Sequence, residues 1–121
     1  MEQLMRVLEA LADPVRLRLV RLLLRGEACV CELVDALQLP QYAVSRHLRH
    51  LRAVGLVEAR REGRWMHYRL AQPLDRQPLY RDLLKTLDAH LASEAVMRVD
   101  ESRLSRASRR LRSCAAGGRR G

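Results

Sequence analysis

The strongest constraint on the fold lies where two helical patterns, at residues 30–37 and 41–54, are separated by only three residues. The intervening residues read Gln-Leu-Pro, and the second pattern stops before Gly55. Proline does not continue a helix, and glycine is favoured just beyond a helix C-terminus. Two helices joined by so short a turn predict a helix-turn-helix.

The helix expected at 41–54 has two different faces. Val44, Leu48 and Leu51 recur at helical spacing and predict the face that packs on the core. The opposite side is polar and basic, which suits the base edges and phosphates of a major groove, although a merely solvated face is the alternative. The candidate DNA-binding residues of this helix are Gln41, Tyr42, Ser45, Arg46 and Arg49.

After Gly55 the period of the sequence changes from helical to alternating. Short runs at 56–60 and 65–70 flank a turn in which Gly63 supplies a positive φ, and together they predict a β-hairpin. A helix-turn-helix followed directly by a basic hairpin is a winged helix. The hairpin residues expected to approach DNA are Arg61 and Arg64.

Helical patterns also precede this unit, at 2–12 and 14–25, and follow it at 79–97. The predicted fold is therefore mostly α with a small β-hairpin, in the order ααααββα. The last pattern carries leucines four residues apart, and we expect a homodimer through the terminal helices. These leucines are Leu79, Leu83, Leu87 and Leu91.

The composition divides the chain into two parts. Residues 1–98 are predicted to form one winged-helix DNA-binding and dimerisation domain. Residues 99–121 are rich in Ser, Arg, Ala and Gly, and we expect them to form a basic, disordered tail.

The net charge of +9 indicates a polyanionic partner, and all but one of the 23 basic residues are arginines. A non-specific architectural DNA binder is one alternative that this charge leaves open. Three cysteines, no secretory leader and no long apolar run predict a cytoplasmic protein without a disulfide scaffold.

Two of the three cysteines, Cys29 and Cys31, lie one residue apart at the start of a predicted helix, and the third is Cys114. This spacing indicates metal or redox chemistry, while small core residues or a thiol oxidoreductase are the alternatives. The helix N-terminus is expected to make the thiols acidic. Residues two apart on a helix point about 200° from each other. Binding one ion to both thiols is therefore expected to unwind the first helical turn.

Three segments, in this order, resemble the ArsR/SmtB family of bacterial winged-helix metalloregulators: LADPVRLRLVRLLLRGE, CVCELVDALQL and VSRHLRHLRAVGLVEARREGRWMHYRL. They span residues 11–70. The resemblance implies a homodimeric repressor, not an enzyme, that leaves its operator when a metal ion or another inducer binds.

Within that family, CVCEL resembles the thiolate site of the arsenic- and antimony-responsive repressors. It implies As(III) or Sb(III) as the inducer, Cys29 and Cys31 as ligands and Cys114 as a candidate third ligand. Some relatives carry a third cysteine where this chain has Val34. The family's zinc pattern on the last helix is incomplete here. We therefore expect a metalloid-responsive repressor of an inverted-repeat operator, and another soft metal or thiol oxidation is the alternative input.

Overall fold

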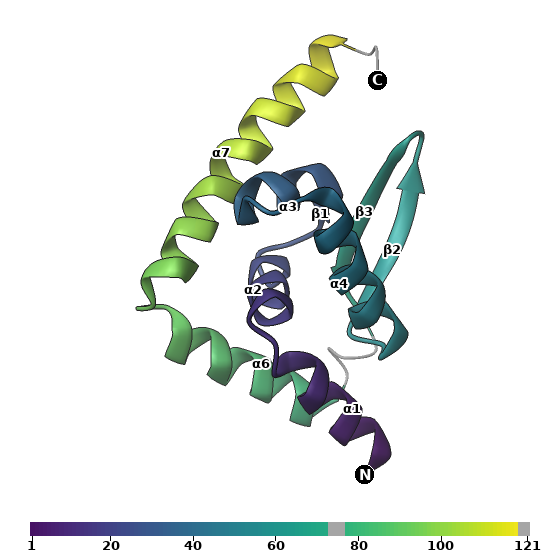
Figure 1. Ribbon diagram of the computed structural model, residues 1–121, viewed down its shortest axis with the longest axis vertical. Coiled ribbons are helices and arrows are strands. Elements are labelled where there is room, and N and C mark those ends of the chain that lie inside the picture. The colour runs from purple at the N-terminus through teal and green to yellow at the C-terminus, as the bar shows by residue number, and fades with distance from the viewer. Residues whose placement is uncertain (73–76, 119–121) are drawn as a thin grey trace.

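The computed structural model describes residues 1–72 and 77–118, with side chains as far as Leu111 (Figure 1). The elements are α1 (Glu2–Leu11), α2 (Pro14–Leu23), β1 (Ala28–Cys29), α3 (Val30–Leu37), α4 (Gln41–Ala53), β2 (Val57–Glu62), β3 (Trp65–Leu70), α6 (Pro78–Leu91) and α7 (Ala95–Gly118). The helix-turn-helix of α3 and α4 and the following hairpin are confirmed. The short strand β1 was not expected, and it extends the hairpin to an antiparallel sheet in the order β1-β3-β2.

Local signals in the sequence set the ends of these elements. The Asp13 carboxylate accepts hydrogen bonds from the backbone N–H groups of Val15 and Arg16, at 2.9 and 3.1 Å, and so caps α2. Gln38 ends α3 in the left-handed conformation, with φ of 57°. Gly63 has φ of +64° in the turn between β2 and β3, where a residue with a β-carbon would be strained.

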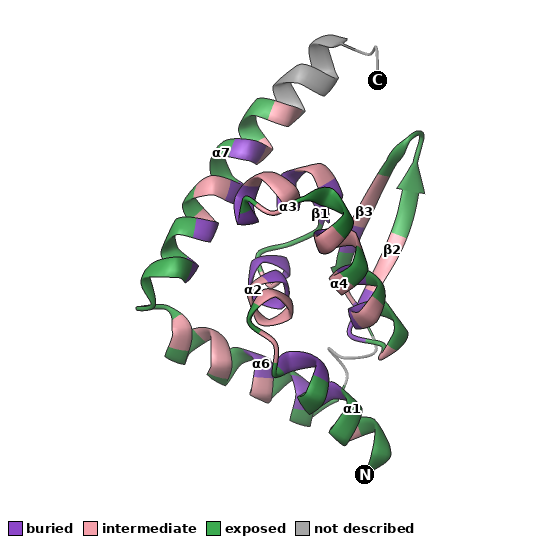
Figure 2. Ribbon diagram, viewed as in Figure 1, coloured by how far each residue is buried: buried purple, intermediate pink, exposed green. Residues whose placement is uncertain are grey.

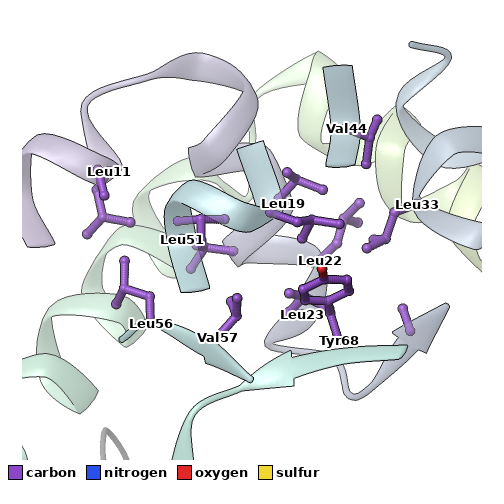
Figure 3. Close-up of a cluster of buried hydrophobic side chains, with 14 of the residues drawn as sticks. Leu11, Leu19, Leu22, Leu23, Leu33, Val44, Leu51, Leu56, Val57 and Tyr68 are labelled. Carbon is purple, nitrogen blue, oxygen red and sulfur yellow. The ribbon is translucent and has the colours of Figure 1, made fainter. Parts of the chain in front are cut away.

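The core gathers around α2 and is built mainly from leucine and valine (Figure 3). Helix α4 contributes Val44, Leu48 and Leu51, and each of these side chains is fully buried, as their spacing predicts. Leu33 of α3 lies in the same cluster, and Figure 2 shows the buried positions concentrated on the inward faces of the helices. The two helices of the helix-turn-helix are therefore held to each other through one continuous apolar core.

The C-terminal part of the chain differs from the expectation. The helix predicted at 79–97 is two helices, because α6 ends at Leu91 and α7 begins at Ala95. The tail expected to be disordered from residue 99 lies in α7 as far as residue 118. Its composition is polar, but Met97, Leu104 and Ala107 are spaced to form one buried face.

Ion pairs to α2 fix α7 in place. Arg18 donates two hydrogen bonds to Asp100, from Nε at 2.8 Å and from Nη2 at 2.9 Å, and the Asp100 side chain is only 1% exposed. Arg21 Nη1 lies 2.7 Å from a carboxylate oxygen of Glu101. These acids follow one another directly in α7, so burial and charge together order a segment that composition alone predicts to be disordered.

Helix α6 lies against α2 and uses part of its leucine stripe for that contact. Leu83 and Leu87 are half-buried against the core and Leu84 is buried, whereas Leu79 is exposed. Within the described ranges, no helix combines the length and the apolar character needed to cross a membrane.

Candidate functional site

The outward face of α4 presents most of the residues that the sequence nominates for DNA contact. Tyr42, Arg46 and Arg49 are exposed, and Tyr42 is 73% exposed despite its aromatic ring. Gln41 is exposed in the first turn of α4, and Ser45 is half-buried on the flank. An exposed helix face with arginine, serine and tyrosine side chains has the donors that phosphates and guanine edges require.

Two further residues of α4, His47 and Arg52, differ in exposure. His47 Nδ1 lies 3.4 Å from Arg16 Nη1, and burial lowers the pKa of this histidine. Its half-buried side chain is that of a packing residue. Arg52 is exposed one helical turn after Arg49 on the same side of α4, and the sequence analysis missed it. The three-residue spacing between these arginines was the signal.

The hairpin arginines fall into two groups. Arg60 is paired with Glu27 at 2.8 Å, and Arg69 is paired with Glu58 at 3.2 Å. Arg61 and Arg64 lie exposed at the end of the hairpin, which projects beyond α4 in Figure 1. Among the described residues neither Arg61 nor Arg64 has a carboxylate partner, so they are the hairpin cations available to an external anion.

The structure brings Cys29 and Cys31 together at the junction between β1 and α3. Their Sγ atoms are 2.7 Å apart, Cys29 is buried and Cys31 is half-buried. Cys29 is not part of the helix. It is the N-cap residue, with φ of −76° and ψ of 149°, and its backbone N–H donates to Glu32 Oε1 at 2.7 Å.

This geometry corrects two expectations about the thiols. The sulfurs were expected to point in opposite directions along a helix, but the extended conformation of Cys29 turns its side chain toward Cys31. The thiols were also expected to be acidic. Burial, followed by the hydrogen bond with Cys29, instead raises the pKa of Cys31 to about 12.

The pair fits a thiophilic ion, as its spacing indicates. An ion bound about 2.3 Å from each sulfur needs the two sulfurs within about 3.8 Å of each other, and the side chains of Cys29 and Cys31 already place their sulfurs in contact. Both sulfurs can therefore reach one ion while α3 remains helical. The parts of the chain whose side chains are described contain no cluster of three or more His, Cys, Asp or Glu residues able to hold a metal. The side chain of Cys114 lies outside those parts.

The cysteine pair is connected to both DNA-facing elements. Cys29 pairs with His67 of β3, the second strand of the hairpin. Cys31 lies in the first turn of α3, whose residue Leu33 packs in the same apolar cluster as Val44 of α4. The two sulfurs therefore lie at the junction between the hairpin and the helix-turn-helix.

Comparisons with known proteins agree with this arrangement. Residues 13–59 match the family model described as bacterial regulatory protein, arsR family. Over 65 residues the chain is 51% identical to the arsenic resistance transcriptional regulator ArsR1 of Pseudomonas putida, covering 53% of this chain and 51% of that one. It is 52% identical over 65 residues to the transcriptional repressor SmtB of Mycobacterium tuberculosis, covering 54% and 48%. The chain thus spans about half the length of these curated relatives.

A solved structure extends the match beyond the segment shared with those relatives. The homodimeric winged helix-turn-helix DNA-binding domain of a possible ArsR-family regulator from Mycobacterium bovis is 36% identical, with a TM-score of 0.63. The match covers 78% of this chain and 86% of that domain. By sequence and by fold, the chain belongs to the ArsR family of bacterial transcriptional regulators.

Proposed function

We propose that this chain is a dimeric transcriptional repressor that leaves its operator when trivalent arsenic or antimony binds Cys29 and Cys31. One observation carries the proposal: two free thiols converge to 2.7 Å where β1 meets α3. Soft ions prefer thiolate ligands, and a pair already side by side needs little reorganisation to bind one.

Binding exchanges thiol protons for the ion. Ligating sulfurs must be deprotonated, so each bound ion displaces protons from the pair. The pKa of Cys31 is raised to about 12, mainly by burial, which means that the proton competes strongly with the ion at neutral pH. A third position on the ion is left to Cys114, to a small-molecule thiol or to water.

The release of DNA follows from the place of the thiols in the fold. An ion bound by both sulfurs links Cys29, which is paired with β3, to Cys31, which lies in the first turn of α3. The hairpin and α4 then lose the relative orientation that fits a half-site. The ion stabilises an arrangement that DNA disfavours, so the two ligands oppose each other through one coupling free energy.

The dimer is proposed to use α1 and α6. Met5 and Leu8 of α1 are exposed, as are Met1 just before α1 and Leu79 of α6, and the two helices lie at the same end of the molecule in Figure 1. Apolar side chains gathered on neighbouring helices are typical of a protein interface. A two-fold dimer places two α4 helices on half-sites of an inverted repeat.

The test is operator binding measured by fluorescence anisotropy, with a duplex carrying the DNA upstream of the chain's own coding sequence. Arsenite is expected to weaken binding of the natural protein by about 5–150-fold. The Cys29→Ser and Cys31→Ser variants should bind the duplex normally and ignore arsenite. Release of both variants at the arsenite concentration that releases the natural protein would contradict the proposal.

Two further measurements test the role of Cys114 and the identity of the inducer. Cys114→Ser removes the third thiol and should respond to arsenite unless Cys114 supplies the third ligand. The relatives carry different names at similar identity, an arsenic regulator and an SmtB repressor, so overall similarity does not select the inducer. Parallel titrations with antimonite, cadmium, zinc and peroxide separate a metalloid input from another soft metal or from thiol oxidation.

A further inference from the structure

The most basic part of the chain lies in α7, on the far side of the helix-turn-helix from the hairpin. From residue 102 to the end, the sequence has seven arginines and no acidic residue. Three of those arginines, Arg103, Arg106 and Arg110, fall on one flank of α7 because their spacing of three and four residues follows the helical repeat. Arg106 and Arg110 are exposed, and Arg103 is half-buried.

This flank has few internal partners. Arg110 reaches Asp35 of α3 at 2.7 Å, which fixes it beside the helix-turn-helix. Among the described residues neither Arg103 nor Arg106 has a carboxylate within 4 Å. Like charges three and four residues apart destabilise a helix. An external anion bound to this flank would therefore reduce the repulsion between its arginines.

The position of α7 in the fold indicates that the anion is the phosphate backbone of DNA. In a helix-turn-helix the second helix enters the major groove while the first crosses the phosphate backbone. Helix α7 packs on that first helix, α3, and carries Arg110 to it. Figure 1 shows α7 and the hairpin rising on opposite sides of α3 and α4 toward the same end of the molecule.

We propose that Arg103, Arg106 and Arg110 form a second DNA-contacting surface, which binds backbone phosphates beside the half-site read by α4. The contacts carry no sequence information and add affinity on any duplex long enough to reach α7. The inference rests on the proposed function only in taking DNA as the partner. It adds a phosphate-binding surface on the opposite side of the helix-turn-helix from the hairpin. The helix that carries this surface is held to the fold by the buried Asp100.

The test compares two variants that remove the same charge. Arg103→Gln/Arg106→Gln neutralises the unpaired arginines of the flank and keeps the Arg110 pair with Asp35. The control, Arg81→Gln/Lys85→Gln, removes two exposed cations from α6, which lies at the other end of the molecule. Equal urea midpoints and helix content by circular dichroism show that both variants are folded.

The readout is the salt dependence of binding to the upstream duplex, and to a scrambled duplex of equal length. Each lost phosphate contact lowers the slope of log K against log salt by about 0.9. The slope of the flank variant should therefore be less steep by up to about 1.8 per protomer, or about 3.6 for the dimer, on both duplexes, while the control keeps the natural slope. On a duplex trimmed by one helical turn at each end, the flank variant should bind like the control.

Two outcomes would overturn the inference. The first is a flank variant with the same slope and affinity as the control on the long duplexes. The second is an unchanged slope accompanied by weaker self-association, which would make the flank a contact between copies of this chain. Failure of the proposed function looks different, because the natural protein would then bind the upstream and scrambled duplexes equally.

Discussion

Replacing Asp100 with alanine tests whether α7 is an ordered part of the fold. The carboxylate is 1% exposed and accepts two hydrogen bonds from Arg18, whose own side chain is 17% exposed. Removing one member of a buried ion pair leaves the other charge without compensation, which costs about 3–5 kcal/mol. Because Arg18 keeps some contact with water, we expect a loss of about 3 kcal/mol. Asp100→Asn keeps the shape and one acceptor, and should lose about 1.5 kcal/mol.

The assay is urea unfolding followed by circular dichroism, with amide hydrogen exchange on α7 as a local reading. A loss of 3 kcal/mol is a large share of the roughly 5–15 kcal/mol that stabilises a domain. The α7 amides should therefore exchange faster in the alanine variant. Asp82→Asn is the control: this side chain is 70% exposed, its one ion pair among the described residues is with its neighbour Arg81 at 3.6 Å, and the change should alter stability by less than about 0.5 kcal/mol. An Asp100→Ala protein with the natural midpoint and natural α7 exchange would refute the reasoning.

Three further predictions concern the core, a helix cap and pH. Leu48→Ala empties a fully buried site and should lower the free energy of unfolding by about 2–5 kcal/mol in the same urea assay. Asp13→Ala removes the cap of α2 and should lower it by about 1 kcal/mol, whereas Asp13→Asn should restore most of that loss. Although burial alone raises the pKa of Glu101, hydrogen bonds from Arg21 and Arg25 hold it below its usual value near 4.5. The stability that Glu101 contributes is thus complete above about pH 4.5 and lost as pH falls through the lowered pKa. Glu101→Gln should show a shallower acid loss in thermal unfolding, and a loss as steep as that of the natural protein would contradict this assignment.

The winged helix follows from local sequence signals. The burial of Val44, Leu48 and Leu51 could be predicted because helical spacing and core contact go together. The same helical spacing places Arg46 and Arg49 on the side of α4 that faces away from the core. The turn at Gly63 was equally clear, because few residues other than glycine accept its backbone conformation.

The order of α7 and the presence of β1 could not be predicted, because both depend on contacts between residues far apart in the sequence. The order of α7 depends on Asp100 meeting Arg18, 82 residues earlier, and no local pattern indicates that contact. Strand β1 is two residues long and exists only because β3 lies beside it. A composition rich in Ser and Arg therefore predicted disorder where tertiary contacts impose a helix.

The backbone conformation of Cys29 decides how the two cysteines are arranged. Both cysteines were identified from their spacing alone, and the structure brings their sulfurs together. The predicted directions of their side chains were wrong, because Cys29 is extended and lies outside the helix. Because of this difference, both sulfurs can bind one ion without unwinding α3, and we propose that the bound ion acts on the DNA-facing elements through the junction of β1 and α3.

The most direct test of the central claim measures the coupling from the thiol side. Linkage requires that operator DNA weaken arsenite binding by the same factor by which arsenite weakens operator binding. Arsenite affinity is measured from sulfur-to-arsenic absorbance for the free protein and for the protein saturated with the upstream duplex, with a scrambled duplex as the control. The account predicts arsenite binding about 5–150-fold weaker on the operator complex, matching the anisotropy result. Equal arsenite affinity with and without operator would contradict it.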